Sequence, residues 1–347
     1  MIKIKEKIEN YLNNENIKSA LKLVRKLNKK SSYYFYYMAQ IKRMMGFMKE
    51  AEKYYLKAIK GGLKLEKQDY LDCLLKLASI SRSFGLKHQS LKYLNMAFKI
   101  DPQNTNVILE KAMYFRMIGD FDNSIKVMNT LLKKYRREKD FQGISYILWA
   151  KGGIYRLSGK LKLSISSYRS AYHYSLKAKD LSLKIYSLLG LAGVMRISGD
   201  VKSSLKTYLK AKKYISKNDI FASAYVYCGI GNSLRQMGDL DNALKNYKKS
   251  YLLYLKTGDF LDLGLVLWGI GECYKRKGKF SSALKYFNKA SGLFNKGFEP
   301  RGKILNMMSI AQIYYLTGNI KKGRKIYDLA YSLSRKNNLS TYLEIFT

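Results

Sequence analysis

The sequence predicts an all-α solenoid, and three observations lead to this fold class. A glycine followed by a helical pattern recurs eight times, in steps of 39, 34, 40, 40, 39, 40 and 40 residues. A period of this size is typical of solenoids, in which each unit buries its apolar face only against its neighbours. The 347 residues include only two prolines, which favours helices over a β-sandwich rich in turns. Apolar residues make up 47% of the chain, enough for a large core, which excludes wholesale disorder.

A frame of small and bulky residues surrounds each repeating glycine. A small residue lies seven positions before the glycine and another lies five positions after it, followed by a bulky residue and a third small one in most units. Small residues at matched places let two helices approach closely, and the bulky residue fills the space beside them. The glycine fits the position after a helix end, where a positive φ is needed, and Asp120, Asp122, Asp239 and Asp241 are candidate amino-terminal caps. The glycines are Gly46, Gly85, Gly119, Gly159, Gly199, Gly238, Gly278 and Gly318.

This frame resembles the tetratricopeptide repeat (TPR), most clearly in residues 229–250 and 269–290, and Asp101–Pro102 matches the proline that closes a standard unit. The resemblance implies a right-handed TPR-like α-solenoid of about eight helix–turn–helix repeats over residues 31–335. Most units exceed the standard 34-residue step, which resembles the long-helix repeats of adaptor proteins. Residues 1–30 are expected to form an incomplete repeat and residues 336–347 a closing helix, because a solenoid needs ends that cover its last apolar faces.

Basic residues recur at one place in the repeat, three residues before the glycine. Six of the 14 arginines of the chain fall there, although lysine is far commoner, and the seventh unit has a lysine. In the TPR family the helix stripe that includes this place lines the concave groove where partners bind. We call these residues the arginine column: Arg43, Arg82, Arg116, Arg156, Arg196, Arg235 and Lys275.

The chemistry of the arginine column predicts an anionic ligand. Only Asp72 and Glu272 are acidic on the same stripe, so most of the column is expected to lack a partner within it. Guanidinium groups suit bidentate capture of carboxylate or phosphate. Gly153 and Gly193 on the stripe are expected to leave room for a ligand. The other groove residues expected to contact it are Tyr146, Trp149, Tyr186, Tyr225, Asn232 and Trp268.

A purely structural interpretation of the arginine column stays open. The arginines would then stack on tyrosines of the adjacent unit, or reach acidic residues elsewhere, and only hold the solenoid together. The aromatic positions are equally open to two interpretations, because aromatics at helical spacing are commonly simple packing residues.

The composition narrows the class of protein. With 65 Lys+Arg against 25 Asp+Glu, the formal charge is +40, which favours an acidic protein, nucleic acid or an anionic membrane surface as partner. The three scattered cysteines indicate reduced thiols and a cytoplasmic location. We expect no metal, because the two histidines lie far apart, no cofactor and no transmembrane segment. The usual phosphate-binding and hydrolase motifs do not occur, so the chain is not expected to be an enzyme.

The leading hypothesis is a non-enzymatic adaptor that captures an acidic segment of a partner protein in the groove. The first alternative is RNA or another polyphosphate, with arginines on phosphates and aromatics stacked on bases. The second is an assembly scaffold that uses its convex lysines against an acidic complex or a membrane, with the groove only structural.

Overall fold

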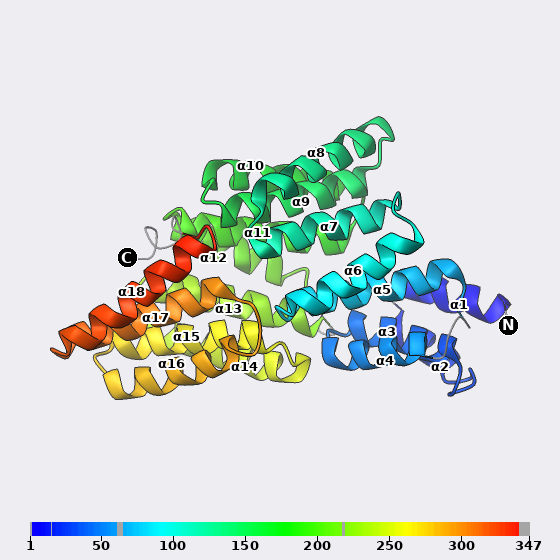
Figure 1. Ribbon diagram of the computed structural model, residues 1–347. Helices are drawn as coiled ribbons and strands as arrows, with labels where there is room; N and C mark the ends of the chain where they lie inside the picture. The colour runs from blue at the N-terminus through cyan, green and yellow to red at the C-terminus, as the bar shows by residue number, and fades with distance from the viewer. Residues whose placement is uncertain (1, 15, 61–64, 217–218, 340–347) are drawn as a thin grey trace.

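The computed structural model describes residues 2–14, 16–60, 65–216 and 219–339, and every regular element within them is a helix (Figure 1). The chain begins with α1 (Ile2–Asn13) and α2 (Ile17–Val24), and the later helices follow one another as eight hairpins, which confirms the predicted all-α solenoid. The closing helix expected at 336–347 falls almost wholly outside the described residues. The hairpins are α3 (Ser32–Met44) with α4 (Met48–Lys60), α5 (Lys67–Ser83) with α6 (Lys87–Ile100), α7 (Thr105–Ile118) with α8 (Phe121–Arg137), α9 (Phe141–Leu157) with α10 (Leu161–Lys177), α11 (Leu181–Ile197) with α12 (Val201–Lys212), α13 (Ile220–Gln236) with α14 (Leu240–Thr257), α15 (Phe260–Arg276) with α16 (Phe280–Phe294), and α17 (Pro300–Leu316) with α18 (Ile320–Lys336).

Each hairpin turns at one of the repeating glycines. The backbone φ of all eight is positive, between 67° and 92°, as the repeat frame predicts. In the first turn the amide of Gly46 donates to the carbonyl of Arg43 at 3.0 Å, and the amide of Phe47 donates to that of Lys42 at 2.9 Å. These bonds satisfy carbonyl groups at the helix end that have no intrahelical partner. The turn therefore holds each residue of the arginine column in the last turn of the first helix.

The four aspartates named as candidate caps behave in two ways. Asp120 and Asp239 cap α8 and α14, because each side chain accepts a hydrogen bond from the amide three residues later, at 3.3 and 3.2 Å. The prediction is wrong for Asp122 and Asp241, which lie inside the first turns of the same helices. A carboxylate there is still favourable, because it lies near the positive end of the helix dipole.

The small residues of the repeat make room for bulky ones. A Cβ added to Gly152 or Gly190 would lie 2.9 or 2.2 Å from the ring of Tyr168, so this ring occupies the space that the two glycines leave on α9 and α11. The hydroxyl of Ser164 also donates to the carbonyl of Gly152 at 2.7 Å. Equivalent bonds join the two helices of three further hairpins, from Ser90, Ser124 and Ser204. The hairpins are therefore fixed by close packing and by a repeated buried hydrogen bond.

The solenoid curls until early hairpins meet late ones, and both lie along the lower side of Figure 1. The amide of Phe298 donates to the carbonyl of Gly85 at 2.8 Å, and the ring of Phe84 stacks on that of Phe260 at 5.7 Å between centroids. A Cβ on Gly297 would lie 2.2 Å from the carbonyl oxygen of Phe84, so the two backbones touch directly. We call these five residues the closure seam. The seam therefore joins the second hairpin to the seventh hairpin and to the loop that follows it.

Candidate binding cavity

Every member of the arginine column lies in the last turn of a first helix, and four of them line cavities between the hairpins. A cation in the last turn of a helix is favoured there by the negative end of the helix dipole. Arg156 and Arg196 line a cavity of about 230 Å³, which we call the central cavity. Arg82, Arg116 and Arg156 line a second cavity of about 280 Å³. Arg156 and Arg301 belong to both linings, so the two cavities adjoin.

One early member of the arginine column has a carboxylate partner that the stripe does not contain. The Nε of Arg82 lies 2.7 Å from Oε1 of Glu110, and Nη2 lies 3.3 Å from Oε2. The two side chains are only 13% and 12% exposed, so this is a largely buried, two-point ion pair. Glu110 lies on α7, outside the predicted stripe. The sequence analysis therefore missed the carboxylate that neutralises Arg82.

The late members of the column share Glu272, the acidic residue that the stripe does contain. Its carboxylate lies 2.8 Å from Nζ of Lys275 and 3.8 Å from Nη1 of Arg235. Arg235 is buried, its Nε donates to the hydroxyl of Tyr247 at 3.2 Å, and its guanidinium lies 5.0 Å from the centroid of the Trp268 ring. The structural interpretation of the column therefore describes Arg82, Arg235 and Lys275 well.

Arg116 is different, because no hydrogen bond or ion pair joins it to another residue of the described chain. Burial, with repulsion from Arg82 and Arg156, lowers the pKa of Arg116 to about 10. The lowered pKa means that the folded protein disfavours this charge, although the group stays protonated at neutral pH. A Cβ on Gly153 would lie 3.0 Å from Nη1 of Arg116. Gly153 thus makes room for the neighbouring guanidinium, where the sequence analysis expected room for a ligand.

Arg196 and Arg43 also carry unsatisfied donors. Both Nε and Nη1 of Arg196 are buried without a hydrogen-bond partner in the described chain, and so is Nε of Arg43. A buried donor without a partner costs about 1–3 kcal/mol, and more when the group is charged. Arg196 lines the central cavity, so an anion that enters the cavity would lie beside its guanidinium.

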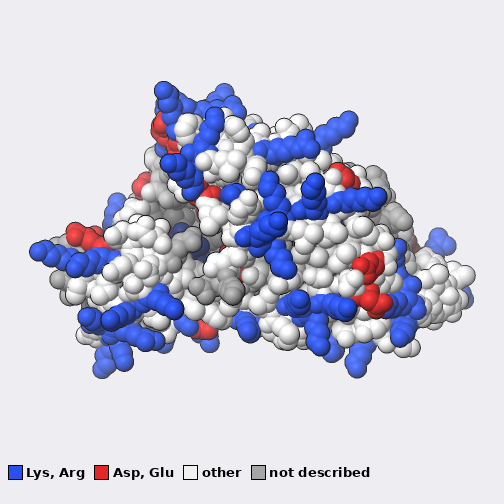
Figure 2. Space-filling model, turned by 180° about the vertical axis from the view of Figure 1, so that it is seen from behind, with Lys and Arg blue, Asp and Glu red and all other residues white. Residues whose placement is uncertain are grey.

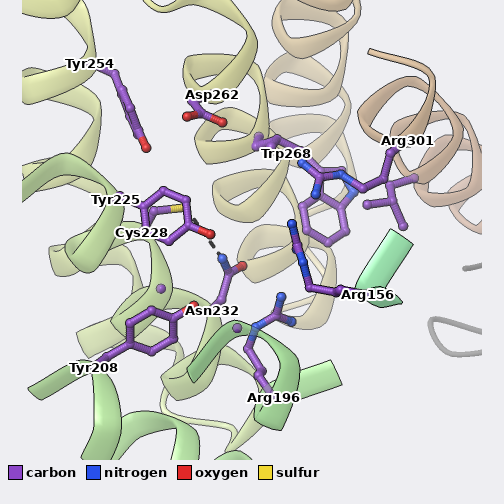
Figure 3. Close-up of a pocket in the computed structure, with 14 residues that line it drawn as sticks. Arg156, Arg196, Tyr208, Tyr225, Cys228, Asn232, Tyr254, Asp262, Trp268 and Arg301 are labelled. Carbon is purple, nitrogen blue, oxygen red and sulfur yellow. Dashed lines mark hydrogen bonds between the residues drawn. The ribbon is translucent and has the colours of Figure 1, made fainter. Parts of the chain in front are cut away.

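Figure 3 shows the central cavity with its polar side chains converging from several helices. Three residues that the sequence predicts as ligand contacts line it: Tyr225, Asn232 and Trp268. The Nδ2 of Asn232 lies 3.5 Å from Sγ of Cys228, and Nε1 of Trp268 donates to the hydroxyl of Ser309 at 2.8 Å. These contacts hold the wall of the cavity in place.

The other three predicted contacts form an aromatic cluster. The rings of Tyr146 and Trp149 lie 5.5 Å apart between centroids, and those of Trp149 and Tyr186 lie 6.4 Å apart. The first two belong to one turn of α9 and the third to α11, so the cluster packs neighbouring hairpins together. A ligand role for these three residues remains a prediction.

The central cavity also contains residues that the sequence analysis did not select, namely Tyr254, Asp262 and Arg301. Asp259 caps α15 and its side chain accepts from the amide of Asp262 at 3.1 Å. Burial raises the pKa of Asp259 well above its ordinary value, and repulsion from Asp262 adds to the effect. Burial also raises the pKa of Asp262, with Glu299 as a further cause and Arg301 opposing it. Two aspartates at the start of α15, with Glu299 and Arg301 at the start of α17 in the next hairpin, were the available sequence signal.

The outer surface has a different character. Figure 2 shows lysine and arginine side chains over much of one face, with few acidic groups among them. No described helix is both long and apolar enough to cross a membrane. The described residues contain no group of three or more histidine, cysteine or carboxylate side chains placed to hold a metal ion.

Comparison with known proteins supports the fold. Residues 221–296 match the family model of the tetratricopeptide repeat, which confirms the resemblance over α13 to α16. No curated protein matches the sequence.

Two solved structures extend the similarity along the chain. A chain of the APC/C hetero-tetramer Cut9–Hcn1 superposes with a TM-score of 0.70 at 16% identity, over 98% of this chain and 63% of that chain. This chain therefore spans less than two thirds of that relative. A Rap protein complexed with competence and sporulation factor gives a TM-score of 0.59 at 12% identity, over 91% of this chain and 94% of that one. At these identities the likeness shows the fold, which is a TPR-type solenoid.

Proposed function

We propose that this tetratricopeptide-repeat solenoid is a non-enzymatic scaffold that binds an acidic segment of a partner protein inside its curled stack. Both similar structures come from complexes, one with Hcn1 and one with competence and sporulation factor, which supports a binding role for the fold. Solenoids present long concave surfaces that suit extended partners. The arginine-lined cavities would hold the acidic side chains of the segment.

The observation that carries the proposal is that some arginines of the column have a carboxylate partner in the described chain and others do not. Glu110 pairs with Arg82, and the single carboxylate of Glu272 lies near both Arg235 and Lys275. Between them, Arg116 has no such partner in the described chain, and Arg196 has two buried donors without acceptors. Partly burying a cation without a carboxylate partner costs stability, so such an arrangement is retained most simply where a ligand supplies the missing charge.

The lining favours a peptide over a purely ionic ligand. Leu265, Leu305 and Trp268 lie beside the polar groups of the central cavity, which gives apolar side chains a place between the acidic ones. RNA or another polyphosphate is the alternative, and the basic outer surface in Figure 2 is the observation that favours it. The two ligands would use different faces of the molecule.

Fluorescence anisotropy with a labelled decaglutamate peptide tests the proposal. The inner double variant Arg116→Gln/Arg196→Gln is expected to weaken binding at least tenfold, because each arginine loses a charge-assisted hydrogen bond worth about 1.5–3 kcal/mol. The outer double variant Arg136→Gln/Arg137→Gln is the matched control, since it removes the same charge from exposed residues at the end of α8. It should bind almost as well as the wild type.

The same two variants separate the alternatives. If the inner double variant binds labelled poly-U RNA more weakly than the wild type does and the outer one does not, the cavity binds polyphosphate. The proposed acidic peptide is then not the ligand of the cavity. If the inner variant binds decaglutamate as tightly as the wild type does, the cavity does not bind acidic segments at all.

A further inference from the structure

The walls of the central cavity carry opposite charges. In Figure 3, Arg156 and Arg196 approach the cavity from one side, while Asp262 and Tyr254 lie across it. Decaglutamate would satisfy the arginine side alone. The acidic side would then face a second negative group, which is unfavourable in a partly desolvated site.

The acidic wall has an excess of negative charge. Asp262 lies in the first turn of α15, with Asp259 capping the same helix and Glu299 capping α17. Arg301 is the cation that acts most strongly on Asp262, and its Nε also lies 3.0 Å from Oε1 of Glu299. Arg156 is a second cation that favours the charged form of Asp262. Burial is the main cause that raises the pKa of both aspartates, so a further cation beside them would favour their charged forms.

We propose that the central cavity selects a segment of mixed charge, in which an acidic side chain meets Arg196 and a lysine or arginine a few residues away meets Asp262. This inference rests on the function proposed above and specifies its partner. The acidic side chain would lie against the guanidinium of Arg196, which lines the cavity. The basic side chain would add a counter-charge for Asp262, because Arg301 also pairs with Glu299.

The size and lining of the cavity agree with this partner. A volume of about 230 Å³ accommodates a small number of side chains, not a folded element. Tyr225 and Trp268 lie between the two walls in Figure 3 and offer ring faces to a passing cation. Because the two charges have separate places, the segment would also have a preferred direction in the cavity.

Three labelled peptides with blocked termini test the inference. The acidic probe contains two adjacent glutamates in a glycine–serine chain, the mixed probe has a lysine placed three residues after them, and the reversed probe has the lysine before them. The protein has a formal charge of +40, so general attraction predicts that the acidic probe binds best. The proposed selection predicts that one of the two mixed probes binds about tenfold more tightly than the acidic probe.

The variant Asp262→Asn is expected to abolish this tenfold preference for the mixed probe. Asp241→Asn is the matched control, because Asp241 lies on the exposed surface beside Lys277. Thermal melts of both variants check that they remain folded. The inference fails alone if the acidic and mixed probes bind the wild type equally, or if the preference persists in Asp262→Asn. If none of the three probes binds, the proposed function fails with it.

Discussion

Arg116 offers the sharpest test of whether the arginine column serves a ligand or the fold. The change Arg116→Met keeps the length of the side chain and removes its charge. The pKa of Arg116 falls from its ordinary value to about 10, through burial and repulsion from Arg82 and Arg156. Each pKa unit corresponds to 1.36 kcal/mol, so the folded state disfavours the charge on Arg116 by roughly 3 kcal/mol. This cost is present at every pH below about 10, because the group is charged in both the folded and the unfolded chain there.

We therefore expect Arg116→Met to stabilise the protein, by up to about 3 kcal/mol. For a chain of this size the melting temperature would rise by about 2 °C per kcal/mol, or several degrees in all. The matched control is Arg82→Met, which leaves Glu110 buried without its partner and should cost roughly 3–5 kcal/mol. The two arginines belong to neighbouring hairpins and occupy the same place in the repeat, yet the signs should be opposite.

Far-UV circular dichroism during heating, at neutral pH and low ionic strength, measures both changes. A solenoid can unfold in stages, so the onset of the first transition is the quantity to compare. Addition of decaglutamate should raise the melting temperature of the wild type more than that of Arg116→Met. If Arg116→Met melts earlier than the wild type, as Arg82→Met should, then Arg116 holds the solenoid together and the functional interpretation of this residue is wrong.

Three further predictions follow from the packing, the buried acids and the closure seam. Gly229→Ala would place a Cβ 2.3 Å from the ring of Tyr208 and should lower the stability of the protein by roughly 1–3 kcal/mol. Gly292→Ala, in open space on α16, should raise the stability by about 0.5–1 kcal/mol. Equal melting temperatures for the two variants would refute the packing argument. Because the pKa of Asp259 is raised in the folded state, the wild type should lose stability as the pH rises above about 4. Asp259→Asn should reduce the difference in melting temperature between pH 5 and pH 8. An unchanged difference would contradict this prediction. Gly297→Ala should part the closure seam and increase the radius of gyration in small-angle X-ray scattering, while leaving helix content unchanged; an unaltered radius would show that the seam absorbs the extra carbon.

Much of the fold could be predicted from the sequence because its determinants are local. The glycines need a positive φ at fixed intervals, and the small residues pair with a bulky one within the same hairpin or the next. The register of the arginine column follows from the same period. These features involve residues that are close in the chain or one repeat apart, so a single sequence shows them.

The charge balance of the cavity could not be predicted in the same way. Glu110 reaches Arg82 from the adjacent hairpin, outside the stripe that helical periodicity selects. Asp262 and Arg301 approach the central cavity from later hairpins because the solenoid curls back on itself. That curvature adds up from small rotations between successive units, and the repeat period shows neither these rotations nor the contacts between distant units that result, such as Phe84 with Phe260.

The closure seam has a kinetic consequence for whatever occupies the interior. It joins Gly85 to Phe298 by one backbone hydrogen bond and adds one aromatic stack, and Gly46 lies against Phe221 beside it. For a ligand that can leave only when the seam opens, the residence times of tight and weak ligands would converge on that opening rate. The opening rate of the solenoid would then set the dissociation rate of the ligand, and the strength of its contacts with any one arginine would not.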